Sequence, residues 1–345
     1  MPIMSSKSQS VSWDIGSYSI KVVVSSGEGE NLKIDKAIEV QNPTGVAVPE
    51  QRLQLDQLQG LIGSIISEYK IPIRNVRYSL PESVVSTQVI DMPNLSDAEL
   101  SSAITWQAEQ YLPIPKEELV TEYQILSRPD AKSAGADNAL RVLLVGTRSQ
   151  VIEQTIDLFR PNGVELELME TQSVSLARQL SLPTEAQNTM FLNIGANMTT
   201  IIALRRGLPF FVLNYPESGE LLTKALINNF SIPRDQAEEY KKTYGLLADQ
   251  ADGKVAAAIR PVVDIILTNV RNALGFFSTR AEQEQVARIF LSGGTSQLPG
   301  LVAYFQSALG LETALVDNFN GLKGNLPAQS QASYSVVLGT AKRKL

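Results

Sequence analysis

The chain contains neither cysteine nor histidine among its 345 residues. The absence of cysteine excludes disulfides, thiolate nucleophiles and cysteine-ligated zinc. The absence of histidine excludes a Ser-His-Asp triad, a histidine general base and an imidazole metal ligand. Any metal must therefore be a hard cation held by oxygen atoms, such as Mg²⁺.

The chain also lacks a large excess of either charge and long apolar runs. The formal net charge is −6, and no basic block is long, so binding to nucleic acid is not expected. The sequence contains no run of about 18 apolar residues, the length that spans a bilayer. Residues 1–10 lack the apolar region of a signal peptide. The basic residues Lys342, Arg343 and Lys344 are too few for an amphipathic membrane anchor. We expect a cytoplasmic protein, and its length predicts two or more domains.

Three glycine-bearing segments carry the functional information. They are DIGSYSIK at residues 14–21, LNIGANMTT at 192–200 and FLSGGTSQLPG at 290–300. The first two lie between β-branched runs, as tight hairpin turns do, and the third follows a buried-strand pattern. Glycine lets backbone N–H groups turn toward a phosphate and lets the phosphate approach closely. Each segment alone could equally be an ordinary turn with a glycine at positive φ.

The rest of the chain predicts alternating strands and helices, hence an α/β protein. A strand–DIG–turn–strand start recurs near the midpoint as strand–NIG–turn–strand, which indicates two related halves around a cleft. Residues 81–163 differ in texture and predict a β-α-β-β-α subdomain, with strands over 84–90, 120–126 and 140–146 and helices over 97–112 and 149–160. Ser96 and Glu99 have the spacing of a capping box at the first of these helices. A polar hairpin loop is expected over 129–138.

In their order, the three segments resemble the phosphate-1, phosphate-2 and adenosine motifs of the actin/Hsp70/sugar-kinase superfamily. The resemblance implies a two-lobed actin-like (ribonuclease H-like) fold that holds ATP and Mg²⁺. Asp14 would hold Mg²⁺, through water, and Lys21 would add positive charge near the phosphates. Backbone and side-chain donors would come from Gly16, Ser17, Tyr18, Ser19, Gly195, Asn197 and Thr199, and the adenosine would lie at Gly293, Gly294 and Thr295.

One position departs from this superfamily. Asn193 stands where an aspartate is usual, and an amide cannot act as a base. We therefore expect nucleotide binding with slow hydrolysis at most. By the same resemblance Gln172 would position the attacking water, although a surface glutamine is an equal alternative.

Two further matches come from bacterial actin-like proteins. Residues 237–241 (AEEYK), followed by Gly245, resemble their A-E-x-x-K signature, in which Glu238 would meet the ribose and Lys241 the adenine side. The alternative is a solvated charged helix. Gly219 stands in a segment that faces the phosphates in relatives.

The inserted subdomain indicates which branch of the superfamily the chain resembles. Its position resembles the FtsA-like branch, and LPESVV (80–85), IDMP (90–93) and WQAEQYLP (106–113) resemble the PilM family of type IV pilus assembly. Most of this pattern is also explained by core packing, in which Trp106, Tyr111 and Leu112 seat the helix on its sheet.

The resemblance to this family implies an organisation of the chain. Residues 1–11 would be a flexible tail, and 12–80 with 164–188 and 325–345 the first lobe (1A). Residues 81–163 would be the inserted 1C subdomain, and 189–324 the second lobe (2A/2B).

The family resemblance also implies a function: an ATP-binding adaptor that binds the N-terminal cytoplasmic tail of a PilN-like inner-membrane protein. It would link that protein to the motor ATPase and platform proteins that drive twitching motility. The adaptor would be peripheral at the inner face of the plasma membrane, which it reaches only through its partner, and self-association is possible. The alternatives are an FtsA-like division protein, a small-molecule kinase or the cytoplasmic module of a type II secretion protein.

Overall fold

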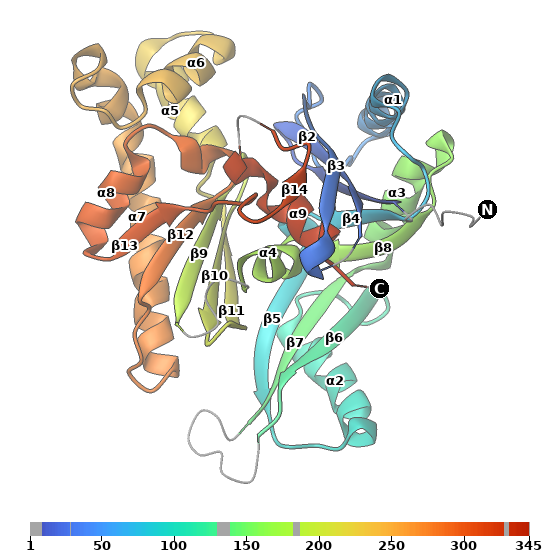
Figure 1. Ribbon diagram of the computed structural model, residues 1–345. Helices are drawn as coiled ribbons and strands as arrows, with labels where there is room; N and C mark the ends of the chain where they lie inside the picture. The colour runs from blue at the N-terminus through green and yellow to red at the C-terminus, as the bar shows by residue number, and fades with distance from the viewer. Residues whose placement is uncertain (1–8, 28, 130–138, 182–186, 328–330, 345) are drawn as a thin grey trace.

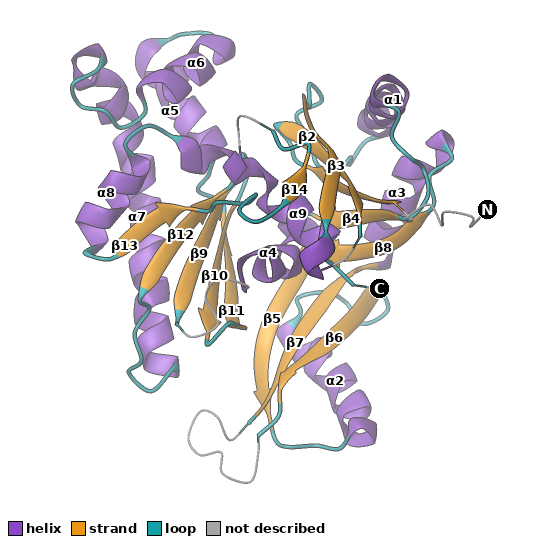
Figure 2. Ribbon diagram, viewed as in Figure 1, coloured by secondary structure: helices purple, strands orange, loops and turns teal. Residues whose placement is uncertain are grey.

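The computed structural model describes residues 9–27, 29–129, 139–181, 187–327 and 331–344. These residues form two large sheets with two helices between them, and a smaller three-stranded sheet below (Figures 1 and 2). Within the described ranges, no helix combines the length and apolar character that crossing a bilayer requires.

The first lobe is built on a six-stranded sheet in the order β14-β3-β2-β1-β4-β8. Its strands are β1 (Gln9–Ile15), β2 (Ser19–Ser26), β3 (Lys33–Gln41), β4 (Val76–Leu80), β8 (Leu166–Thr171) and β14 (Lys323–Gly324). Helices α1 (Arg52–Tyr69) and α3 (Ser149–Phe159) supply apolar side chains to a core on one face, which contains Trp13, Tyr78 and Phe159. The Phe159 ring meets the Trp13 and Tyr78 rings edge-on, with centroids 5.7 and 5.4 Å apart.

The second lobe repeats this design with the order β11-β10-β9-β12-β13. Its strands are β9 (Thr189–Ile194), β10 (Thr199–Arg205), β11 (Leu208–Tyr215), β12 (Arg288–Ser292) and β13 (Glu312–Leu315). Five strands of each large sheet share one pattern of directions, antiparallel at the first two junctions and parallel at the last two. The predicted internal duplication is therefore confirmed.

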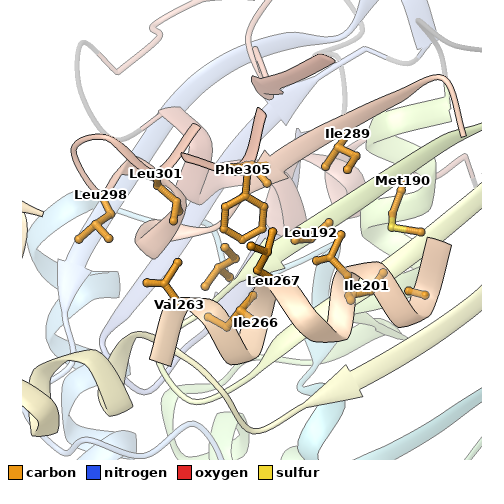
Figure 3. Packing of buried hydrophobic residues seen from close by; sticks show 14 of the residues in the cluster. Met190, Leu192, Ile201, Val263, Ile266, Leu267, Ile289, Leu298, Leu301 and Phe305 are labelled. Atoms are coloured by element: carbon orange, nitrogen blue, oxygen red, sulfur yellow. The ribbon is translucent and has the colours of Figure 1, made fainter. Parts of the chain in front are cut away.

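Helices of the second lobe share one hydrophobic core with the outer face of its sheet. They are α5 (Gly219–Phe230), α6 (Arg234–Tyr244), α7 (Lys254–Arg280) and α8 (Leu301–Leu309). Alternation in β9 directs Met190 and Leu192 toward Leu267 of α7 and Phe305 of α8, as Figure 3 shows. The same alternation places Asn193 on the opposite face of the sheet, toward the first lobe.

Two helices, α4 (Gln172–Ser181) and α9 (Ser335–Ala341), lie between the large sheets (Figure 1). Leu176 of α4 and Val336 of α9 share a core with Phe191 of the second sheet, whereas Val337 packs with the first-lobe sheet. The two helices cross closely because position 339 is glycine: a Cβ there would clash with the Ser175 carbonyl. The lobes are thus joined by one tightly packed helix pair.

The inserted subdomain is a sheet in the order β5-β7-β6, covered on one face by α2 (Asp97–Tyr111). Its strands are β5 (Val85–Met92), β6 (Leu119–Ser127) and β7 (Leu140–Arg148). The capping box is confirmed, since the Ser96 N–H donates to Glu99 Oε2 over 2.9 Å and the Glu99 N–H donates to Ser96 Oγ over 3.4 Å. The expected loop over 129–138 lies outside the described residues apart from its first residue.

Three predicted boundaries are wrong. Strand β1 begins at Gln9, so residues 9–11 are not a tail, and residues 1–8 lie outside the described residues. Helix α3 packs on the first-lobe core, so the insertion ends with β7 rather than at 163. The chain re-enters the first lobe before residue 325, because Phe319 packs in that lobe and β14 pairs with β3.

The packing interpretation of residues 106–113 is confirmed only in part. Leu112 is buried, as expected, in the core of the inserted subdomain. Trp106 and Tyr111 are instead 57% and 50% exposed, so they do not seat the helix on its sheet. These two aromatic side chains are available for other contacts.

Candidate nucleotide site

The first glycine segment forms the turn between β1 and β2. The Gly16 N–H donates to the Ser19 carbonyl over 3.0 Å, and the Asn42 amide donates to the Gly16 carbonyl over 2.9 Å. Ser17 and Tyr18 lie at the tip, half-buried. The predicted hairpin is therefore present, and its turn is held by one hydrogen bond within it and one from Asn42.

Asp14 lies at the end of β1 on the face opposite the Trp13 core. It is 4% exposed, and burial raises the pKa of its carboxyl, an effect opposed by Lys21 and Gln172. The Gln172 Nε2 donates to Asp14 Oδ1 over 2.8 Å, and the Lys21 ammonium is 3.9 Å from Oδ2. The fold thus brings together three of the predicted residues, with Gln172 supplied by the first position of α4.

Two expected phosphate donors in this segment have other partners. The Ser19 hydroxyl donates to Glu39 Oε1 over 2.7 Å, and its side-chain role toward phosphate stays a prediction. Lys21 also lies 4.0 Å from Glu39, so two carboxylates share its positive charge. Sequence reasoning missed Glu39 because a glutamate in a half-exposed strand is unremarkable.

The second turn joins β9 and β10 and gathers the start of α5. The Gly195 N–H donates to Met198 O over 2.9 Å, and the Gly195 carbonyl accepts from the Gly219 N–H at 3.0 Å and the Thr295 hydroxyl at 3.1 Å. Gly195, Gly219 and Thr295, predicted separately, therefore meet at one point.

Asn197 and Thr199 of the second turn differ. Asn197 is exposed at the tip. The hydroxyl of the buried Thr199 donates to the Glu217 carbonyl over 2.6 Å, and its role as a phosphate donor stays a prediction.

The third segment lies directly against the second turn. A Cβ on Gly293, whose φ is +84°, would lie 2.5 Å from the Ile194 carbonyl and 2.8 Å from Asn193 Oδ1, so only glycine fits without displacement. Asn193 Oδ1 accepts a 3.3 Å hydrogen bond from the Ser292 hydroxyl. Gly294 is exposed, and apart from its chain neighbours no described atom lies within 4 Å of its Cβ position.

Helix α6 holds its signature residues differently from the expectation. The Lys241 ammonium donates to the Gly219 carbonyl, the Thr223 hydroxyl and Glu238 Oε1 over 3.1, 2.7 and 2.6 Å. Burial lowers the pKa of Lys241, although Glu238 opposes this. These contacts make Lys241 a residue that orients Glu238 and anchors α5. They do not support the predicted contact with the adenine side.

The next lysine reaches the first lobe. The Lys242 Nζ donates to the Tyr18 hydroxyl over 2.5 Å and lies 4.6 Å from the centroid of the Tyr18 ring. This contact joins α6 of the second lobe to the first turn. The i, i+4 spacing of Ala237 and Lys241 could have identified the inward lysine, and by elimination the outward one.

Glu82 is a further buried carboxylate that the sequence did not reveal. It lies between β4 and β5, 5% exposed, and burial raises its pKa. Its Oε1 accepts from the Ser173 N–H at 2.7 Å and its Oε2 from the Asn214 amide at 3.1 Å. It therefore joins the base of the inserted subdomain to α4 and to β11 of the second lobe.

Two lobes that repeat one five-strand pattern, with glycine turns and a hydrogen-bonded Asp–Gln pair between them, define an actin-like fold. The sequence model of the family described as "Type IV pilus assembly protein PilM" matches residues 12–341. The chain therefore belongs to the PilM family of type IV pilus assembly proteins.

Solved structures agree on the fold. The chain is 23% identical to a chain in the solved structure "PilM-PilN type IV pilus biogenesis complex", with a TM-score of 0.84; the match covers 97% of this chain and 98% of the other chain. Ethanolamine utilization protein EutJ from Carboxydothermus hydrogenoformans is 14% identical, with a TM-score of 0.59 and coverage of 97% and 89%. MreB 5 of Spiroplasma citri, bound to AMPPNP, is 13% identical, with a TM-score of 0.53 and coverage of 96% and 94%.

Proposed function

We propose that this chain binds ATP between its two lobes and acts as an adaptor in type IV pilus assembly. The observation that carries the nucleotide part is the convergence of the second and third glycine segments with α5, where Gly195 accepts hydrogen bonds from Gly219 and Thr295. The first segment meets the same lobe through the contact of Tyr18 with Lys242. The open space at Gly294 is suited to an adenosine. The structure of MreB 5, with the same fold, contains the ATP analogue AMPPNP.

The residues present also fit Mg²⁺. Among the described residues, no group of three or more acidic side chains could hold a metal ion. A cation here would need phosphate oxygens and water as further ligands, as Mg²⁺ accepts in nucleotide sites. Asp14 supplies the carboxylate, and its raised pKa reflects burial that a bound cation would offset. When bound, Mg²⁺ would neutralise phosphate charge.

Hydrolysis should be slow at most. Gln172 lies on Asp14 and can orient a water molecule near the phosphates. Asn193 lies beside Gly293, where it can offer a carbonyl oxygen but cannot accept a proton as a carboxylate would. The chain thus retains groups that position ligands and lacks a base at that position. ATP would act mainly by holding the lobes in one relative arrangement.

The partner in this proposal is the N-terminal cytoplasmic tail of a PilN-like inner-membrane protein. The solved PilM-PilN complex contains a chain that this one matches over 97% of its length. An extended tail gains affinity from main-chain hydrogen bonds and a few side-chain anchors. The exposed Trp106, Tyr111 and Tyr123 of the inserted subdomain are suitable anchors, because aromatic residues are enriched at protein interfaces.

Through this partner the chain would lie at the cytoplasmic face of the inner membrane. There it would link the membrane complex to the pilus motor and platform proteins, and so to twitching motility.

Calorimetric titration tests the proposal. The full chain, with Mg²⁺ and ATP, is titrated with a synthetic peptide of the cytoplasmic tail from the PilN-like protein of the same genome. We expect one site of micromolar affinity. Trp106→Ala should weaken the peptide about tenfold, whereas Leu53→Ala, a truncation of an exposed side chain on α1, should not.

Two negative results separate the parts of the proposal. If ATP binds but the peptide does not, the adaptor function is refuted and the division or kinase alternatives are favoured. Absence of ATP binding would remove the nucleotide site itself.

A further inference from the structure

Lys241 and Lys242 are consecutive in sequence but have opposite environments. Lys241 is buried, with its ammonium bonded to three groups of its own lobe. Lys242 is exposed, and its ammonium reaches the Tyr18 hydroxyl at the tip of the first turn. Since helical periodicity puts adjacent residues about 100° apart, only one of them can face the first lobe.

The charge on Lys242 is not neutralised by a carboxylate. Among the ion pairs of the described residues, Lys21 takes part in two, with Asp14 and Glu39, whereas Lys242 takes part in none. Its polar contact is a neutral phenol, and the Tyr18 ring beneath it adds a cation–π attraction. The turn that is proposed to receive phosphate therefore has a positioned, unneutralised cation beside it.

We propose that Lys242, positioned by Tyr18, is a ligand for the phosphate chain of a bound nucleoside triphosphate. The inference rests on the nucleotide site proposed above and adds the residue that selects for phosphate charge. A hydrogen bond from an ammonium to an ionised oxygen is roughly twice as strong as one to a neutral acceptor. Phosphate oxygens at the turn would thus replace the phenol as the acceptor for Lys242.

This placement also gives the ligand a structural effect. Lys242 belongs to α6 of the second lobe and Tyr18 to the first, so a phosphate held by both the turn and Lys242 joins the lobes. A ligand stabilises the closed arrangement only by its extra affinity for that arrangement. Adenosine lacks phosphate and would gain nothing from Lys242, whereas ATP would gain most.

The experiment measures the affinities of ATP, ADP and adenosine, with Mg²⁺, for the full chain and three variants. Lys242→Met removes the charge, Lys242→Arg keeps it, and Lys224→Met removes an exposed lysine of α5 in the same lobe as a matched control. We expect Lys242→Met to weaken ATP about tenfold, an energy of about 1.4 kcal/mol. The affinity for ADP should fall less, and the affinity for adenosine should not change. Lys242→Arg and Lys224→Met should stay within about twofold of wild type.

The other results overturn the inference in distinguishable ways. An equal loss for ATP and adenosine would assign Lys242 to holding the lobes together rather than to phosphate. No loss for any ligand would leave it without a role in binding. Failure of wild type to bind either ATP or adenosine would overturn the proposed nucleotide site, and this inference with it.

Discussion

Removal of the buried Glu82 carboxylate should destabilise the junction of the three sheets. In Glu82→Ala, the Ser173 N–H loses its acceptor in a site that water barely reaches, whereas the exposed Asn214 amide can turn to water. Ser173 is the second residue of α4, so its N–H has no partner within the helix. A hydrogen bond to a charged group contributes about 1.5–3 kcal/mol. Relief of the buried charge offsets part of the loss of the Ser173 bond, so we expect a net loss of about 2 kcal/mol.

Glu82→Gln tests the charge separately from the hydrogen bonds. A glutamine oxygen can still accept from Ser173, and Asn214 can turn its own oxygen toward the new amide, so the loss should be about 1 kcal/mol. Burial raises the pKa of Glu82 above its usual value of 4.5, so the native state binds more protons than the unfolded state. The contribution of a raised carboxyl pKa to stability is therefore fully present below pH 4.5 and is lost as the pH rises through the native pKa.

Urea unfolding between pH 4.5 and 7.5 measures both effects. The advantage of wild type over Glu82→Gln should be largest near pH 4.5 and narrow as the pH rises. Glu153→Ala, at an exposed position of α3, is the control and should change stability by less than about 0.5 kcal/mol. Two results would refute the reasoning. One is a loss of stability below about 1 kcal/mol in Glu82→Ala. The other is a difference in stability between wild type and Glu82→Gln that does not vary with pH.

Three other predictions concern the candidate site and its supports. Asn193→Asp should raise ATP hydrolysis by at least about tenfold, because it supplies a carboxylate base; phosphate release measures this, and an unchanged rate would mean that the amide is not limiting. Gly293→Ala should cost about 1–3 kcal/mol, because alanine disfavours a φ of +84° and its Cβ would press on the Ile194 carbonyl; thermal unfolding measures it, and a wild-type melting temperature would contradict the geometry. Arg280→Ala removes the 3.0 Å contact with Asp91 between α7 and β5, so amide exchange in β5 should accelerate while exchange in β1 stays constant.

The sequence predicted the hairpins because their signals are local. A glycine turn between two β-branched runs specifies a hairpin with little influence from the rest of the chain. The capping box at Ser96 and Glu99 is local in the same way, and it forms as expected. Asp14 and Gln172 come together because the actin-like connectivity, inferred by resemblance, brings the start of α4 to the end of β1.

The failures concern contacts between distant segments. Periodicity showed that residues 149–160 form a helix with an apolar face, but it could not show which core receives that face. Phe159 packs on Trp13 and Tyr78, so α3 belongs to the first lobe. Glu82 was missed for a similar reason, because its partners Ser173 and Asn214 lie far along the chain and no pattern around residue 82 indicates burial.

The first turn of α4 connects the proposed nucleotide site to the inserted subdomain. Gln172 contacts Asp14 through its side chain, and the adjacent Ser173 holds Glu82 through its backbone N–H. Because neighbouring residues of one helix make both contacts, a displacement of α4 at the nucleotide site must also act on Glu82, at the start of the insertion. Asn214 adds the second lobe to the same carboxylate. Bound ATP would thus act on the inserted subdomain, which is proposed to bind the partner, through one packed helix; this requires neither a long relay of side chains nor rapid hydrolysis.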